Sequence, residues 1–84
     1  MRRDIPVTVI FFAALRERAG CAECQIAVPD PATVADVWPR LPKRIRRSDA
    51  PDGVRYAVND TWADAARPLI AGDRIALLMP FSGG

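Results

Sequence analysis

Residues 5–12, IPVTVIFF, have the composition of a strand that lies against a core. The segment is rich in β-branched and aromatic side chains, which favour extended structure. Side chains alternate between the two faces of a strand. One face is therefore uniformly apolar and is expected to meet the core: Ile5, Val7, Val9 and Phe11. The other face is mixed: Pro6, Thr8, Ile10 and Phe12. With 84 residues, we expect a single domain covering 1–84.

The next segments predict a short helix and a second strand. The sequence AALRERAG, 13–20, favours a helix that stops at Gly20. ECQIAV, 23–28, follows as a strand and ends at PDP, so the first two strands are expected to form a hairpin-like pair.

Residues 32–47 predict a second helical element. Thr33 is suited to be its N-cap. Pro39 and Pro42 do not suit a long regular helix, so we expect a short or kinked one. Four apolar residues recur at helical spacing and should face the core: Val34, Val37, Trp38 and Leu41.

The second half of the chain reads as strands and turns. Residues 46–53 have turn chemistry, and VRYAVN, 54–59, predicts a third strand. Asn59-Asp60 favours a turn into a short returning strand, TWA. After a loop containing Gly72, RIALLMP, 74–80, predicts the last strand. The order of elements predicts an α+β fold, a sheet with helix packed on one face.

The composition of the chain argues against several classes of function. The net charge of +2 is too small to indicate nucleic-acid binding by itself, and the chain has no His, the usual acid/base group at neutral pH. Cys21 and Cys24 are too few for a zinc site, so we expect two reduced thiols and no metal, with redox chemistry as the alternative.

With one cysteine pair only, we expect a cytoplasmic protein. The N-terminal apolar run resembles a signal peptide, but Asp4, Pro6 and Thr8 interrupt it, and no stretch suits a membrane span.

A basic run, KRIRR, occupies 43–47. It suits a solvated loop near a helix end; the alternative is docking to an acidic partner or a polyanion. The run lacks the interleaved aromatic residues of a single-strand nucleic-acid platform.

Three stretches, FFAALRERAG, AVNDTWA and PLIAGDRIALLMPFSGG, occur in this order. Together they resemble the small subunit of molybdopterin synthase, a ubiquitin-like sulfur carrier. The resemblance covers nearly the whole chain and implies a β-grasp fold: a mixed sheet packed against one main helix plus short helical segments. It also implies that residues 80–84 form a protruding C-terminal tail.

The resemblance implies a carrier, not a catalyst, and no cofactor bound by this chain. Gly84 would be adenylated by a ubiquitin-activating-type enzyme that uses ATP, and then converted to a thiocarboxylate. The large synthase subunit, in a heterotetramer, would receive the tail, and the sulfur would pass to a cyclic pterin precursor. Glycine at 83 suits a narrow channel, because it has no side chain. The rest of the tail is Pro80, Phe81 and Ser82, and Phe81 is expected either to anchor the tail or to make a local contact.

Strand alternation predicts a partner-facing patch. If Ile75 enters the core, Leu78 stays exposed beside the tail. With Phe12 and Trp62 it would form an apolar patch of the kind that anchors protein interfaces. Similar positions are apolar and partner-facing in the family. The alternative is that these side chains complete a small core.

Other functions share this fold and tail. One is a sulfur carrier for thiazole (thiamine) or cysteine synthesis; another is a protein modifier attached to target lysines through Gly84. A third is a plain β-grasp interaction domain with an inert tail. FFAALRERAG favours the molybdopterin branch.

Overall fold

The computed structural model describes residues 3–46 and 53–79. Five strands form one sheet in the order β2-β1-β5-β3-β4, with β5 at the centre. β1 (Arg3–Phe11) pairs antiparallel with β2 (Glu23–Asp30) and parallel with β5 (Arg74–Leu78). β3 (Arg55–Val58) pairs antiparallel with both β5 and β4 (Thr61–Ala63). The prediction of an α+β fold with a mixed sheet is confirmed.

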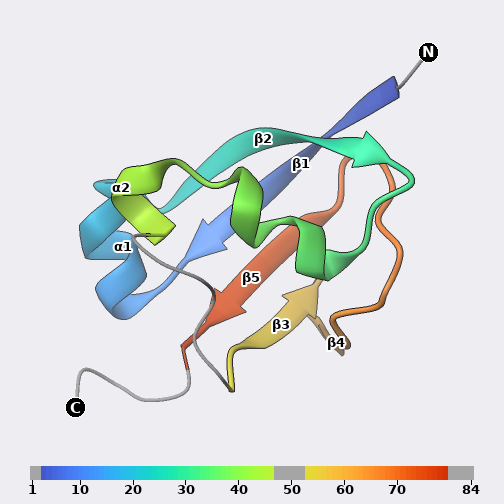
Figure 1. The fold of residues 1–84 in the computed structure, drawn as a ribbon. Coiled ribbons are helices and arrows are strands. Elements are labelled where there is room, and N and C mark those ends of the chain that lie inside the picture. The colour runs from blue at the N-terminus through green and yellow to red at the C-terminus, as the bar shows by residue number, and fades with distance from the viewer. Residues whose placement is uncertain (1–2, 47–52, 80–84) are drawn as a thin grey trace.

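Helical segments cover one face of this sheet (Figure 1). α1 (Ala13–Ala19) follows β1 directly and ends at Gly20, whose φ of 74° is the left-handed conformation that favours glycine. The prediction of a short helix stopped at this residue is confirmed. α1 buries Leu15 and Ala19 and lies beside α2 (Lys43–Arg46) (Figure 1).

The second helical element is divided more finely than the sequence predicted. It consists of two 3₁₀ turns, η1 (Val34–Asp36) and η2 (Trp38–Arg40), followed by α2. Thr33 caps η1 as expected, since its side chain and that of Asp36 form a reciprocal capping box. Proline removes a backbone donor and fixes φ. Pro39 lies within the first turn of η2 and Pro42 lies between η2 and α2, so no single main helix forms here.

The core lies between the helical segments and the sheet. The expected inward face of β1 is buried, with Val7 and Val9 fully shielded from solvent. Ile75 and Leu77 of the central strand are likewise fully buried. The four apolar residues predicted at helical spacing are buried as well: Val34, Val37, Trp38 and Leu41. These burials supply most of the hydrophobic stabilisation of so small a fold.

The limits of four strands differ from the sequence prediction. β1 runs from Arg3 to Phe11 and not over 5–12, and β3 runs from Arg55 to Val58 and not over 54–59. β2 continues through Pro29 to Asp30. Proline cannot donate a backbone hydrogen bond, but it is tolerated here because β2 is an edge strand that pairs with β1 only. β5 ends at Leu78, and Met79 leaves the strand and packs partly against the core. The predicted tail, 80–84, and most of the predicted loop at 46–53 lie outside the described residues.

Candidate functional site

The face of the sheet opposite the helices is its open face. Cross-strand pairing aligns Ile10, Ala76, Ala57 and Trp62 in one row across four adjacent strands. Paired residues in a sheet place their side chains on the same face. The first three are half-buried, and Trp62 is 59% exposed. The centre of the open face is therefore apolar.

The three residues predicted to form a partner patch all lie on this open face. Phe12 continues β1 in extended conformation beyond its last strand residue and is 47% exposed. Phe11 pairs with Leu77, so Phe12 lies next to Leu78, the half-buried last residue of β5. Trp62 lies two strands further along the sheet. The structure thus places the three on one face, with Phe12 and Leu78 at the end where β5 leads into residues 80–84 and Trp62 in the central row.

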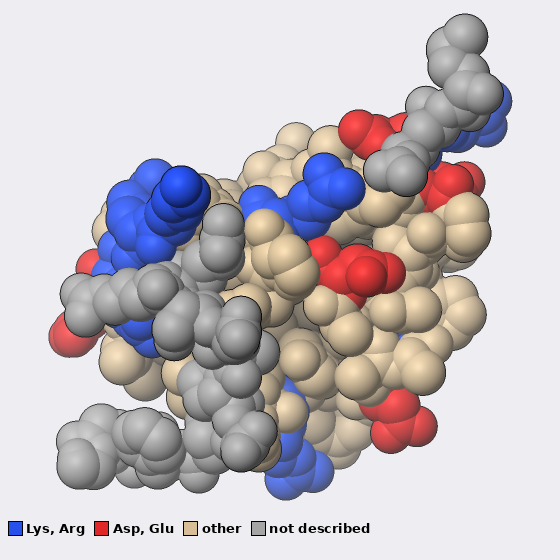
Figure 2. Space-filling view, viewed as in Figure 1, with Lys and Arg blue, Asp and Glu red and all other residues tan. Residues whose placement is uncertain are grey.

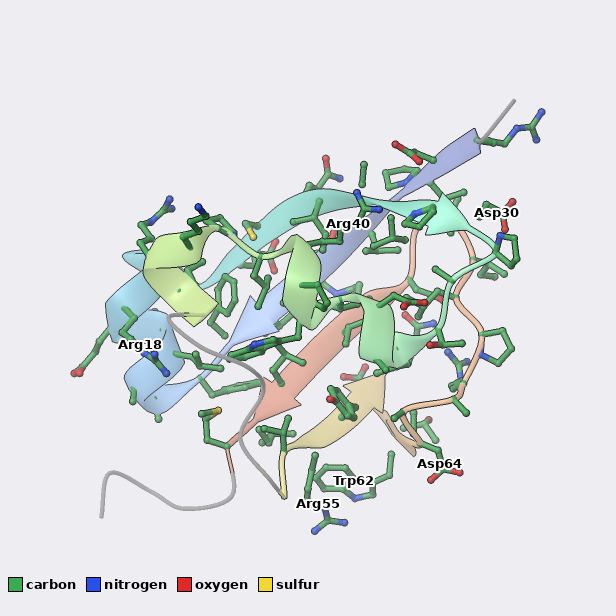
Figure 3. All side chains as sticks on the ribbon, viewed as in Figure 1. Arg18, Asp30, Arg40, Arg55, Trp62 and Asp64 are labelled. Carbon is green, nitrogen blue, oxygen red and sulfur yellow. The ribbon has the colours of Figure 1, made fainter. Side chains whose placement is uncertain are left out.

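Arg55 lies between Leu78 and Trp62, and the sequence analysis did not single it out. It pairs with Leu78 across β3 and β5, and its guanidinium carbon lies 4.2 Å from the centroid of the Trp62 ring. Figure 3 shows the two side chains against each other at the edge of the sheet. The signal in the sequence was the alternation of β3, which places Arg55 and Ala57 on the same face. Their proximity to Trp62 required the hairpin register as well.

A shallow hollow of about 400 Å³ borders this end of the open face. It is lined by Arg55, by Trp62 and by Asp64, the residue that follows β4 (Figure 3). In the part of the chain that the structure describes, no carboxylate approaches Arg55 within ion-pair distance, Asp64 included. Among the residues that the structure describes, Arg55 is therefore a cation without a carboxylate partner, beside an apolar surface.

The opposite end of the open face is polar and carries an ion pair. Arg74 donates to the Glu23 carboxylate at 3.0 Å, across β1. Both side chains are about half exposed, so this ion pair contributes little to stability.

The two cysteines lie on the helix side of the sheet and are free thiols. Burial raises the pKa of the Cys24 thiol, the nearby Cys21 thiol raises it further, and the Arg44 cation opposes both effects. A high pKa leaves less of the nucleophilic thiolate, so Cys24 is poorly suited to nucleophilic chemistry. Within residues 3–46 and 53–79, no three side chains of His, Cys, Asp or Glu are grouped as for a metal ion.

Basic side chains gather over α1 and α2 (Figure 2). Lys43 and Arg44 of the predicted basic run are exposed on α2, which lies beside α1. Arg47, the last residue of that run, lies outside the described residues. This basic surface is on the helix-covered side, away from the apolar patch. Over the described ranges, no helix has the length and apolar character of a membrane span.

Comparison with known proteins identifies the relationship. The model of the ThiS family matches residues 9–84. The chain belongs to the ThiS family. The molybdopterin synthase sulfur carrier subunits of Drosophila erecta and Drosophila melanogaster are 31% and 30% identical to it, and the alignments cover the whole of both chains. The resemblance to these small ubiquitin-like carriers, expected from the sequence, is confirmed.

Solved structures agree with this relationship. Small archaeal modifier protein 1 from Haloferax volcanii superposes with a TM-score of 0.76 at 27% identity, over 94% of this chain and 99% of that one. A Pyrococcus furiosus protein, provisionally assigned as molybdopterin converting factor subunit 1, gives 0.74 at 28% identity, over 92% and 99%. The ubiquitin-like β-grasp fold is therefore confirmed. Some of the relatives are named as sulfur carriers and others as protein modifiers.

Proposed function

We propose that this chain is the sulfur-carrier subunit of a molybdopterin synthase and that Gly84 carries the sulfur. The observation that carries the proposal is the position of β5. This strand is central in the sheet, is anchored by two fully buried side chains, and leads directly in sequence into MPFSGG. A reactive end that follows the best-held strand can enter a partner's active site while the body keeps its fold. The full-length similarity to carriers of this name supports the proposal.

The chemistry proposed for Gly84 begins with activation. A terminal carboxylate, with a pKa of about 3.5, is an anion at neutral pH and resists nucleophilic attack. An adenylating enzyme of the ubiquitin-activating type would convert it with ATP to an acyl adenylate, releasing pyrophosphate. A sulfide donor would then attack the acyl carbon, displace AMP as the leaving group and leave a thiocarboxylate on Gly84. Gly83 adds no side chain that would obstruct a narrow channel. This chain itself binds no cofactor in the scheme.

The large subunit of the synthase would then receive the tail, in a heterotetramer, and the sulfur would pass to a cyclic pterin precursor. The apolar end of the open face is suited to hold that partner. Phe12 and Leu78 lie at the end of β5 from which the tail continues, Trp62 lies on the same face, and exposed aromatic residues often dominate the energetics of an interface. Phe81, which follows two residues after Met79, would lie in the partner's groove.

Intact-mass analysis tests the proposal. The chain should be purified from cells that contain its matching activating enzyme, and a sulfur-for-oxygen mass shift located at Gly84 is expected. An unchanged mass, with an activating enzyme shown to be present and active, would contradict it. Copurification of the large synthase subunit separates this carrier from one that serves thiazole or cysteine synthesis.

A protein modifier is the second candidate, since the Haloferax volcanii relative is named as one. In that function the Gly84 carbonyl would end in an isopeptide bond to a lysine of a target protein. Conjugates that contain the C-terminal peptide of this chain, found in digests of cell extract, would favour it. A chain with an inert tail would give neither these conjugates nor the mass shift.

A further inference from the structure

We propose that Arg55 determines partner specificity on the open face: it recognises a carboxylate of the large synthase subunit, beside the apolar site that receives Trp62. This inference rests on the proposed function and adds the chemistry of the partner's surface. It follows from the position, the stacking and the missing counter-charge of Arg55.

The position of Arg55 places it inside any interface that uses the apolar patch. Leu78 is its cross-strand partner on one side, and Trp62 stacks against it on the other. A partner that covers both of these residues must also cover the guanidinium between them. Of the charged side chains that the structure describes on this face, Arg74 and Glu23 neutralise each other at the far end.

Covering an uncompensated charge is costly, since the cation loses its water. In the free chain Arg55 is exposed, so water hydrates its charge, and no described carboxylate pairs with it. Asp64 borders the same hollow but forms no ion pair with Arg55. A partner must therefore bring its own acceptor, and a carboxylate satisfies both the charge and the N–H donors. A partner without one would be rejected, which is how an unpaired charge confers specificity.

The stacking prepares Arg55 for this contact. With its plane against the Trp62 ring, a guanidinium keeps its edge N–H groups free to donate in a fork to two carboxylate oxygens. Stacking also restricts the side chain before binding, which lowers the entropy lost when the ion pair forms. A lysine at this position would keep the charge but lose both the fork and much of the stacking.

Binding to the cognate large subunit provides the first test. Arg55→Gln should weaken the complex on the order of tenfold and Arg55→Glu by a hundredfold or more, while Arg55→Lys should lie between wild type and Arg55→Gln. The Kd of Arg55→Gln should also depend less on salt than that of the wild type. Arg40→Glu makes the same charge change on η2, on the helix side, and is expected to have little effect (Figure 3).

Zero-length cross-linking provides the second test, and the composition of the chain makes it specific. Lys43 is the only lysine. In a Lys43→Arg, Arg55→Lys variant, position 55 therefore carries the only side-chain amine. A carbodiimide, applied to the saturated complex, should join this position to an Asp or Glu of the large subunit, as identified by peptide mass spectrometry. The matched Lys43→Arg, Arg40→Lys variant should give no such product.

The outcomes separate this inference from the proposed function. If Trp62→Ala weakens the complex while Arg55→Gln and Arg55→Glu bind as tightly as wild type, the carboxylate contact is wrong and the docking face stands. The absence of a cross-link from position 55 in a saturated complex would also overturn the contact. If the chain never acquires the sulfur-for-oxygen mass shift, the proposed function itself fails.

Discussion

The Asn59 amide donates to the Asp73 carboxylate at 2.9 Å and so joins the β3–β4 turn to the loop that precedes β5. Asn59 also accepts from the backbone N–H of Arg74, and Asp73 accepts from that of Ile70. Two short motifs, AVND and AGD, are thereby connected over fourteen positions of sequence. The link aligns β3 with β5, and this alignment sets Arg55 beside Leu78 at the other end of the two strands.

Removing the Asp73 carboxylate should destabilise the fold. Asp73 is 3% exposed, so in Asp73→Ala the amide of Asn59 and the N–H of Ile70 would lose a buried acceptor, and Arg67 would lose its ion-pair partner. We expect a loss of about 2–3 kcal/mol in the free energy of unfolding, measured by urea denaturation. Asp64→Ala, at an exposed carboxylate, is the control and should change stability by less than about 0.5 kcal/mol. Equal losses for the two variants would show that the Asp73 hydrogen bonds are not stabilising.

The conformation of Asn59 can be separated from its hydrogen bonds. Its φ is 51°, a left-handed value that glycine adopts without strain and alanine does not. Asn59→Gly removes the side-chain bonds only, whereas Asn59→Ala adds the strain of the turn. Both variants should be destabilised, and Asn59→Ala should be the less stable by about 1 kcal/mol in urea unfolding. If the two variants are equally stable, φ at this turn is not under the constraint inferred.

Replacing each of the two tryptophans should reduce stability to a very different extent. Trp38 is 6% exposed and fills the core, so Trp38→Ala should cost about 3–5 kcal/mol in unfolding free energy. Trp62→Ala loses a stack with Arg55 on an exposed surface and should cost less than about 1 kcal/mol. Urea unfolding measures both values. A large destabilisation by Trp62→Ala would favour the alternative that this side chain completes the core.

Alkylation of Cys24 should show a high pKa. In a Cys21→Ser variant only this thiol reacts, and its rate with iodoacetamide should rise with pH at a midpoint above that of the same protein in denaturant, about 8.5. Burial remains the leading cause after Cys21 is replaced, so the shift should persist in part. Arg44→Gln removes the opposing cation and should move the midpoint to still higher pH.

The sign of the linked stability change follows from the same shift. The folded state holds the Cys24 proton more tightly than the unfolded state does. The stability that this thiol contributes is thus complete below about pH 8.5, the unfolded value, and is lost as the pH rises through the raised folded pKa. Identical alkylation profiles for the folded and unfolded protein would contradict the assignment.

Local patterns in the sequence predicted much of this fold. The alternation of Val7 and Val9, the Asn59-Asp60 turn and the stop at Gly20 each depend on a few neighbouring residues, and the structure has all three. For residues 34–46 the sequence predicted a short or kinked helix, but not its division into two 3₁₀ turns and a short α-helix. Proline indicates that a helix is interrupted, but tertiary packing decides which turns remain.

Contacts between distant segments could not be predicted in the same way. The sequence offered Phe12, Trp62 and Leu78 as a patch because each is a large apolar residue at an expected strand end. Arg55 was missed because its role depends on two registers, β3 with β5 and β3 with β4. The Asn59–Asp73 bond likewise needs the three-dimensional arrangement of two loops. The predicted roles of residues 80–84 rest on the family resemblance and stay predictions.

Deleting Gly84 should abolish sulfur loading without affecting the fold. The buried residues that the structure describes all precede the tail, and the last of them is Leu77. The shortened chain should therefore unfold within about 0.5 kcal/mol of the wild type. In cells with the activating enzyme it should show no sulfur-for-oxygen mass shift, because the carboxylate that is activated would be displaced by one residue.

Adding one alanine after Gly84 tests the same requirement from the other side. The reacting carboxylate would then be locked in a peptide bond, so the lengthened chain should fold normally, acquire no sulfur at Gly84 and fail to restore molybdopterin synthesis in cells that lack their own carrier. Intact-mass analysis must show that the added residue is retained, since trimming would regenerate the active end. Restoration of synthesis by an untrimmed, lengthened chain would mean that the sulfur does not travel on the Gly84 carboxyl group.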